Sequence, residues 1–443
     1  MAVTSDGKIF RRIGDQCIPV RVEDILQLSE EKGIYLWELV KTKYTINDTP
    51  SINIDIFVMS IRESSRVSPF IKEKTDLEIL ENYHLIDDGY LTNIGVLWLG
   101  NAYLRARLTY PITVLYNVYD HLENKVRGYG WHDHTFSPSE LLLDIEREAI
   151  ELRYFHEFST GLFRKRIPHY NAKLIRELLI NAFAHRSFTI SQDIRIDVYP
   201  DRLEISNPGG LPAGITANNI LHTQNRRNPC MIEILKALGL MEGEGSGYDL
   251  MYQLNAMEAK KQPTIEADYG TVKVIQSSAI IDSDILPLLD YVRNHFELTQ
   301  KGSIAFGVIA QEHKILSTEL SKKLQLSSQD KLKNYTSKLL EDKLIITEGN
   351  KKGTSYSVNP SLIQNSRANI KTTLKTIAKH TLKALVLEDL KLNPNSKIKD
   401  ISERLPDVPM QTLRTMIYHL VKEGQLQHTD AKRNRTYRLN SKS

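Results

Sequence analysis

The sequence predicts an α+β protein whose body is followed by two repeated C-terminal modules. Between residues 106 and 282, strand-like alternation is interleaved with stretches of helical periodicity. Beyond Asp284, the segments Ser317–Asn359 and Lys397–Asn440 align with about one residue of slippage, which indicates an internal repeat. Positive charge also gathers there. From Ile285 to the end, 27 Lys and Arg face 15 Asp and Glu, although the whole chain carries only +4.

Composition narrows the class of protein. At 443 residues, the chain is long enough for several domains of about 150 residues each. No apolar run approaches the roughly 18 residues of a membrane-spanning helix, and the N-terminus lacks the apolar core of a signal peptide. The two cysteines, Cys17 and Cys230, suit neither a disulfide framework nor a zinc site. We therefore expect a cytoplasmic protein without a membrane partner.

The expected elements follow from local patterns. Near the N-terminus we expect two short strands and then a helix beginning at Val22. The two N-terminal strands are Lys8–Arg12 and Cys17–Val20. The further expected strands are Ile112–Tyr119, Asp193–Tyr199, Arg202–Ser206 and Thr271–Gln276. The further expected helices are Asn53–Arg66, Lys72–Asn82, Pro138–Phe158, Asn171–Arg186 and Cys230–Leu238.

The first motif with chemical content is RELLINAFAHR, over Arg176–Arg186 on a predicted helix. Glu177 and Asn181 are four residues apart and therefore share one helix face. A carboxylate can orient and deprotonate water, and an amide oxygen one turn later can ligate Mg²⁺ held by nucleotide phosphates. In isolation, a surface Glu and a capping Asn would be the more common interpretation.

Two glycine-rich segments follow. In DRLEISNPGGLPAG, a predicted strand ends at Asn207, and Gly209 and Gly210 permit unusual backbone angles beside it. A polar side chain there can reach the edge of a base. In GLMEGEGSGYDL, Gly243, Gly245 and Gly247 alternate directly before a helix, where free backbone N–H groups favour phosphate. No Gly-Lys-Ser/Thr follows, so this is not a Walker A loop.

The order of these motifs resembles the N, G1 and G2 boxes of the GHKL ATPases. Together with HR after the first box, NPGGLP, RRNP, LGL and GSG, it is more narrowly similar to bacterial RecG-like ATP-binding proteins. Those proteins join an AlbA-type, Schlafen-related domain to a GHKL unit and C-terminal winged helices. The resemblance implies a GHKL (Bergerat) α/β sandwich with C-terminal winged helix-turn-helix domains. It covers nearly the whole chain and is most specific over Glu177–Gly247.

The resemblance also assigns roles to individual residues. It implies ATP and Mg²⁺ as ligands, with Glu177 as the general base and Asn181 as the Mg²⁺ ligand. The other implied nucleotide-binding residues are Asn207 and Gly209 at adenine with Gly210 beside them, Gly243, Gly245, Ser246 and Gly247 at the phosphates, Arg226, Arg227 and Asn228 in a lid, and Thr271 near the base. Most GHKL enzymes have Asp where this chain has Asn207, so the amide keeps an acceptor but lacks the charge.

The resemblance suggests five segments. They are 1–31, which resembles only the tail of an AlbA-type domain, 32–105 as a helical connecting region, 106–282 as the GHKL domain, 285–363 as one winged helix and 368–443 as a second. The sequence leaves open whether the chain forms a homo-oligomer.

The C-terminal modules indicate double-stranded DNA as a partner. In a winged helix, the second helix enters the major groove and the wing touches phosphates. The candidate DNA contacts are Lys331, Lys333, Lys351 and Lys352 in the first module, and Arg414, Lys432, Arg433 and Arg435 in the second. The alternative is that these modules contact protein instead. The wing KRNRTYR is dense enough in positive charge to favour phosphate.

These observations predict an ATP-binding, nucleotide-responsive DNA-binding protein that acts as a transcriptional regulator. The first alternative is a DNA-stimulated GHKL ATPase that hydrolyses ATP through Glu177 as an effector, for example in defence against foreign DNA. The second alternative is a regulator whose degenerate pocket binds little nucleotide.

Overall fold

A computed structural model describes most of the chain. The described residues are 2–3, 9–13, 16–19, 35–160, 163–212, 215–217, 219–220, 227–241, 247–326, 331–349, 353–366, 379–405, 408–429 and 435–440. By internal contacts the chain divides into two units. The first comprises Met1–Ile281, Leu298–Ile304 and Leu324–Lys331, and the second comprises Asp282–Glu297, Ala305–Lys323 and Leu332–Ser443.

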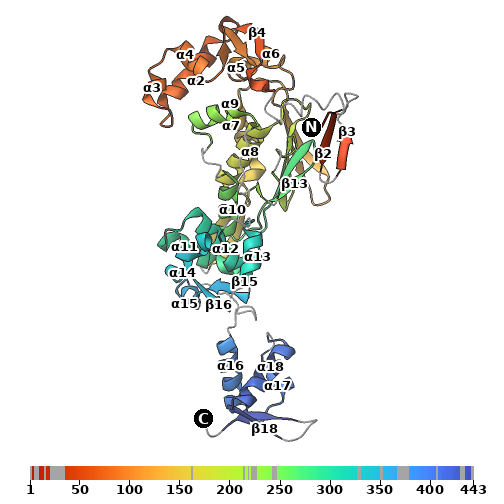
Figure 1. Ribbon diagram of the computed structural model, residues 1–443, viewed down its shortest axis with the longest axis vertical. Helices are drawn as coiled ribbons and strands as arrows, with labels where there is room; N and C mark the ends of the chain where they lie inside the picture. Colours follow the sequence, from red (N-terminus) through yellow and green to blue (C-terminus); the bar gives the residue numbers. More distant parts are fainter. Residues whose placement is uncertain are drawn as a thin grey trace. The chain divides into compact units, whose positions relative to one another are not determined.

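The N-terminal strands form a small antiparallel sheet in the order β1-β2-β3 (Figure 1). These strands are β1 (Ala2–Val3), β2 (Ile9–Ile13) and β3 (Gln16–Pro19). The expected pair of strands is present as β2 and β3, each within a residue or two of its predicted bounds. The helix expected from Val22 falls outside the described residues.

The connecting region is mainly helical, with a three-stranded sheet in the order β4-β6-β5. Its elements are η2 (Trp37–Leu39), β4 (Lys41–Thr45), η3 (Ile46–Asp48), α2 (Ser51–Glu63), α3 (Pro69–Lys72), α4 (Asp76–Asn82), β5 (Ile86–Asp87), β6 (Tyr90–Thr92), α5 (Asn93–Leu99) and α6 (Ala102–Arg105). Every residue of α5 is buried. An added Cβ at Gly95 would collide with the carbonyl oxygen of Leu85, so this close approach requires glycine.

A six-stranded mixed sheet forms the centre of the first unit, in the order β13-β14-β12-β11-β7-β8. Only β11 and β7 are parallel; the other neighbours are antiparallel. Its strands are β7 (Val114–Tyr119), β8 (Lys125–Trp131), β11 (Ile194–Val198), β12 (Arg202–Pro208), β13 (Thr264–Ala267) and β14 (Thr271–Ser277). This mixed sheet, together with its helices, confirms the α+β class.

Helices pack against this sheet on one side (Figure 1). The elements between and after its strands are α7 (Pro138–Glu148), η4 (Ile150–Arg153), the hairpin β9 (Phe155–Thr160) and β10 (Phe163–Pro168), α8 (Ala172–His185), α9 (Pro229–Ala237) and α10 (Gly247–Met257). Helix α8 contacts α7, α10 and β12. This central helix carries the predicted Glu and Asn of the first motif.

The helix expected over Pro138–Phe158 was wrong in its second half, because α7 ends at Glu148. Ala149 has ψ of 66°, outside the helical region, and a short 3₁₀ helix and strand β9 follow it. The Glu151 carboxylate accepts a hydrogen bond from Tyr116 Oη at 2.6 Å and pairs with Arg127 at 3.1 Å. These tertiary bonds draw the chain toward β7 and β8, and they cannot be seen in local periodicity.

One hydrophobic core joins the connecting region to the sheet and its helices. It includes Trp37 and Ile61 from the connecting region, Ile196 from the sheet, and Phe183 and Ile234 from the helices. Burial of this apolar surface is the main force that holds the two predicted segments together.

The C-terminal elements repeat one order: two helices and then a two-stranded hairpin. Preceding them are η6 (Ser283–Ile285), α11 (Leu286–His295), α12 (Gln300–Glu312) and β15 (Lys314–Leu316). The first set is α13 (Ser317–Lys323), α14 (Lys333–Glu341), β16 (Ile345–Glu348) and β17 (Ser355–Val358), and after α15 (Pro360–Asn365) and α16 (Lys379–Leu392) the second is α17 (Ile398–Arg404), α18 (Met410–Lys422), β18 (Leu426–His428) and β19 (Tyr437–Leu439). The last module has its own core, formed by residues from α16 to β19. The winged-helix assignment itself stays a prediction.

Candidate nucleotide site

Helix α8 places the first motif. Its N-terminus is capped by Asn171, whose side chain accepts from the backbone N–H of Lys173 at 3.0 Å. Glu177 is only 8% exposed, and Asn181 follows it one turn later. Asn181 Nδ2 donates to Glu177 Oε1 at 3.1 Å, so the predicted pair is in contact. This bond holds the carboxylate and turns the amide oxygen of Asn181 away from it.

The end of the third motif lies against this pair. Gly247 begins α10, and α10 packs on α8. An added Cβ at Gly247 would collide with Glu177 Oε1 and lie 2.8 Å from its Cδ and 3.2 Å from Asn181 Nδ2. The helix start therefore approaches the carboxylate as closely as only glycine permits. Gly243, Gly245 and Ser246 lie outside the described residues.

Strand β12 places the second motif and continues one residue past Asn207. By strand alternation, Asn207 shares a face with Leu203 and Ile205, which are both buried in the core beneath the helices. Its own side chain is 9% exposed. Within the described part of the chain, Asn207 Oδ1 is buried and has no hydrogen-bond partner. Buried acceptors are normally satisfied, so this atom is a candidate for a ligand contact.

Gly209 and Gly210 form the turn after β12. Gly209 has φ of +103°, a conformation that favours glycine, and its N–H donates to the Gly270 carbonyl at 2.7 Å. An added Cβ there would collide with the guanidinium of Arg227. Across the ladder, Thr271 pairs with Pro208, and its backbone N–H donates to Asp268 Oδ1 at 2.7 Å. Thr271 thus lies one register position from Asn207.

Arg227 and Asn228 are bonded into the protein. Arg227 donates from Nη1 to the His185 carbonyl at 2.9 Å and from Nη2 to the Gly210 carbonyl at 2.7 Å. Asn228 Nδ2 donates to the carbonyls of Ala184, at 3.1 Å, and Arg186, at 2.8 Å. Both side chains therefore join the start of α9 to the C-terminal end of α8. Their expected contact with nucleotide stays a prediction, and Arg226 lies outside the described residues.

His185, at the end of α8, sits in an environment that opposes its positive charge. Burial, and secondly the nearby charge of Arg227, lower the pKa of His185 from 6.5 to about 4. The ring is therefore neutral near pH 7. Burial also raises the pKa of Tyr248 on α10, with smaller effects of Tyr252 and Glu177.

Sequence reasoning missed a buried carboxylate from the connecting region. Glu38 is 1% exposed and accepts from the backbone N–H of Cys230, at 3.0 Å, and of Met231, at 2.6 Å. It therefore caps the N-terminus of α9, where a negative charge is favoured. The neighbouring Trp37 stacks on Phe188, with ring centroids 4.0 Å apart and planes 5° from parallel. No local pattern could have found this cap, since more than 190 positions separate donor and acceptor.

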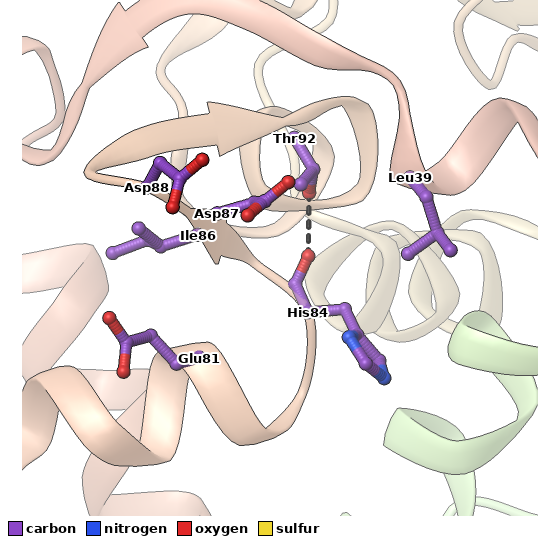
Figure 2. Close-up of a pocket in the computed structure, with 7 residues that line it drawn as sticks. All are labelled: Leu39, Glu81, His84, Ile86, Asp87, Asp88 and Thr92. Atoms are coloured by element: carbon purple, nitrogen blue, oxygen red, sulfur yellow. Dashed lines mark hydrogen bonds between the residues drawn. The ribbon is translucent and has the colours of Figure 1, made fainter.

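A separate hollow of about 460 Å³ lies in the connecting region (Figure 2). None of the predicted site residues lines it; its lining is Leu39, Glu81, His84, Ile86, Asp87, Asp88 and Thr92. Lys41 pairs with Asp87 at 3.1 Å and with Asp88 at 2.6 Å, and Thr92 Oγ1 donates to the His84 carbonyl at 2.7 Å. Internal bonds therefore satisfy most of its polar groups.

Neither a preformed metal cluster nor a membrane helix is found in the part of the chain that the structure describes. Among the described residues, no group of three or more His, Cys, Asp or Glu side chains could hold a metal ion. Likewise, no helix in the described part of the chain is both long and apolar enough to cross a bilayer.

The predicted DNA contacts that the structure describes are exposed. Lys331 precedes α14, Lys333 begins it, and both are exposed. Arg414 is exposed on α18, whose opposite face buries Leu413, Met416, Ile417 and Leu420. Arg435 is exposed before β19, whereas Lys351, Lys352, Lys432 and Arg433 lie outside the described residues.

Comparisons with known proteins agree with the ATPase-type sheet. Residues 191–275 match an HATPase family model described as "Putative ATP-dependent DNA helicase recG C-terminal". The match spans Asn207 to Thr271 but stops short of Glu177. It supports an ATPase-domain family for this segment and suggests ATP binding.

One solved structure is similar over nearly the whole chain. It is the crystal structure of the DIP2311 protein from Corynebacterium diphtheriae, with 20% sequence identity and a TM-score of 0.59. The similarity covers 99% of this chain and 76% of that one, and at this identity it concerns the fold alone. None of the curated proteins matches the chain.

Proposed function

We propose that this chain binds ATP with Mg²⁺ in a GHKL-type pocket and that the bound nucleotide biases DNA binding by its C-terminal modules. One observation carries the proposal. The start of α10 meets the Glu177–Asn181 pair so closely that a side chain at Gly247 would collide with the carboxylate. A helix N-terminus that favours phosphate thus ends beside a carboxylate and an amide suited to nucleotide chemistry.

The phosphates would lie at the N-terminus of α10. This helix has 11 residues, so its first N–H groups and its dipole favour an anion. Gly243, Gly245 and Ser246 would precede it around the phosphates. Because glycine has no side chain and that of serine is small, the backbone could approach the phosphate oxygens.

Glu177 would act as general base. Its Oε1 accepts a hydrogen bond from Asn181 Nδ2, and its carboxylate would orient a water molecule. Glu177 would take a proton from that water as it attacks the terminal phosphorus, and the bond to the bridging oxygen would break to give ADP and phosphate. The small exposed fraction of Glu177 keeps this carboxylate from bulk solvent.

The amide oxygen of Asn181 is a suitable ligand for a nucleotide-bound Mg²⁺. Because its nitrogen donates to Glu177, its oxygen would be the atom that binds the cation. Mg²⁺ usually takes one or two protein ligands together with substrate phosphates and water, so the site needs no preformed cluster. When bound, the ion would neutralise charge that develops on the phosphates.

The adenine ring of the nucleotide would contact Asn207, whose buried Oδ1 has no hydrogen-bond donor among the described residues. Gly209 and Gly210 would shape this side of the pocket, and Thr271 would lie nearby on β14. Arg226 would belong to the lid, and Arg227 and Asn228 would form the C-terminal end of the lid. Arg227 and Asn228 would act by fixing that end to α8.

Double-stranded DNA would be bound by the C-terminal modules, as winged helices. The exposed Lys331, Lys333 and Arg414 lie on or beside the second helix of each module. The hairpin tips would add Lys351, Lys352, Lys432, Arg433 and Arg435. In this role the protein is a nucleotide-responsive transcriptional regulator. The presence of a candidate general base, Glu177, supports one alternative function, a DNA-stimulated ATPase that acts as an effector.

A paired assay tests the nucleotide part. Thermal unfolding of the full chain is measured with and without Mg²⁺ and ATP, and phosphate release is measured with and without duplex DNA. We expect ATP with Mg²⁺ to raise the unfolding temperature of wild type and of Glu177→Gln alike, because this substitution keeps the binding contacts. Phosphate release, where wild type shows it, should vanish in Glu177→Gln.

The outcomes separate the candidates. Absence of any nucleotide-dependent shift in wild type would contradict the proposal. Turnover that DNA stimulates would favour the effector, whereas binding without turnover would favour the regulator.

A further inference from the structure

The side-chain amide of Asn207 ends in a buried place without a protein donor. It lies on β12, on the face shared with buried Leu203 and Ile205, and its backbone is paired with Val272 in the ladder. Its Oδ1 is buried and without a partner among the described residues. A buried acceptor left unpaired is costly, so its presence here points to a donor supplied by a ligand.

Two glycines form the turn beside this amide. Gly209 adopts φ of +103°, and an added Cβ at Gly210 would lie 2.6 Å from the Asp268 carbonyl oxygen. The two positions therefore carry no side chain that could reach Asn207 and satisfy it. A base that lies here, as the proposed function requires, would meet the side-chain amide of Asn207.

An amide can direct either of two hydrogen-bonding groups toward such a base. Its oxygen accepts hydrogen bonds and its nitrogen donates them, and a half turn about the Cβ–Cγ bond exchanges the two. Rotation of Asn207 would break no protein hydrogen bond at Oδ1 within the described residues. A carboxylate at this position could only accept.

We infer that Asn207 contacts the 6-substituent of a purine in either orientation, so that the pocket takes 6-amino and 6-oxo purine nucleoside triphosphates with similar affinity. The amide accepts from the 6-amino group of adenine and donates to the 6-oxo group of guanine or hypoxanthine. This inference rests on the proposed function and specifies its ligand class. The pocket selects a purine triphosphate rather than ATP alone.

Calorimetry on the full chain with Mg²⁺ tests the inference, using ATP, GTP and ITP as separate ligands. ITP carries the 6-oxo group without the 2-amino group of GTP, so ATP against ITP isolates the 6-position. We expect the dissociation constants for ATP and ITP to agree within about fivefold, since either orientation of the amide makes one hydrogen bond. This comparison needs no variant.

Asn207→Asp gives the second comparison, because a carboxylate keeps the acceptor and removes the donor. We expect the preference for ATP over ITP to rise by a further factor of roughly ten or more. Asn101→Asp is the matched control: Asn101 is an exposed cap of α6, and the same change in charge there should leave the ratio unchanged.

Each outcome decides the matter. ATP binding with ITP excluded by more than about fiftyfold would overturn this inference and leave the proposed function intact. A ratio that Asn207→Asp does not change would overturn the assigned role of Asn207. If none of the three nucleotides binds, the proposed function fails and this inference fails with it.

Discussion

Substitution of Glu38 should destabilise the first unit. The carboxylate is 1% exposed and accepts two backbone N–H groups at the start of α9. Glu38→Ala would leave both donors buried without a partner and would remove a negative charge from a helix N-terminus. Hydrogen bonds to charged groups contribute about 1.5–3 kcal/mol each, and capping effects reach about 2 kcal/mol.

These contributions overlap, so we expect Glu38→Ala to lower the free energy of unfolding by about 3 kcal/mol. At 2–4 °C per kcal/mol for a unit of this size, the unfolding temperature should fall by roughly 6–12 °C. Differential scanning calorimetry of the full chain measures this on the transition of the first unit. Glu38→Gln keeps one acceptor oxygen and should lose about half as much.

The control is Glu81→Ala, which removes an exposed carboxylate from α4 and should cost less than about 0.5 kcal/mol. If Glu38→Ala is no more destabilising than Glu81→Ala, the cap does not hold α9 to the connecting region. The reasoning from buried hydrogen bonds would then be refuted.

Three further predictions concern pH, the glycine at the start of α10 and the second hairpin. Because burial and Arg227 lower the pKa of His185 to about 4, its neutral form is favoured in the folded state, so stability should fall as pH drops from about 6.5 to about 4. Urea unfolding across this window should show a weaker pH dependence for His185→Gln, and equal slopes would contradict the shift. Gly247→Ala should displace the Glu177 carboxylate and lower phosphate release or ATP affinity at least tenfold. The unfolding temperature should change little, since the obstructing atom, Oε1, lies at the end of the Glu177 side chain. Unchanged nucleotide binding and phosphate release would contradict the close approach. The third prediction concerns three positive charges of the second hairpin, Lys432, Arg433 and Arg435. Their removal should reduce the slope of log affinity for duplex DNA against log salt concentration by about 0.9 per lost phosphate contact. An unchanged slope would argue for a protein partner.

Local pattern was sufficient for the helix and hairpin around the site. Helix α8 begins and ends within a residue of its predicted bounds, and β11 and β12 lie at the predicted strands. The contact between Glu177 and Asn181 also follows from the sequence alone, because residues four apart on a helix are neighbours. These features depend on interactions over a few residues.

Features that depend on distant partners could not be predicted. The approach of Gly247 to Glu177 joins positions 70 residues apart, and motif order alone suggested it without giving contact. Strand β8 has exposed residues over most of its length and two glycines, so its apolar alternation is weak. The local sequence around Glu38 is typical of a surface carboxylate, and its burial depends on its distant bonds to the start of α9 and on the packing of Trp37 on Phe188.

The lid residues illustrate the same limit within the site. The resemblance placed Arg226, Arg227 and Asn228 in a lid over the nucleotide. Nothing in the sequence indicated that Arg227 and Asn228 bond to backbone carbonyls at the end of α8 and in the turn after β12. A positively charged motif predicts that its side chains will bind an anion or a backbone carbonyl, and the fold determines which of the two they contact.

The most direct test of nucleotide binding at α8 and α10 is calorimetric titration of the full chain with ATP, with and without Mg²⁺, in wild type and Asn181→Ala. We predict saturable binding that Mg²⁺ strengthens in wild type, and a loss of at least tenfold in affinity with little remaining effect of Mg²⁺ in Asn181→Ala. Equal affinity in the two proteins, or no binding by wild type, would contradict a nucleotide site at Glu177, Asn181 and Gly247.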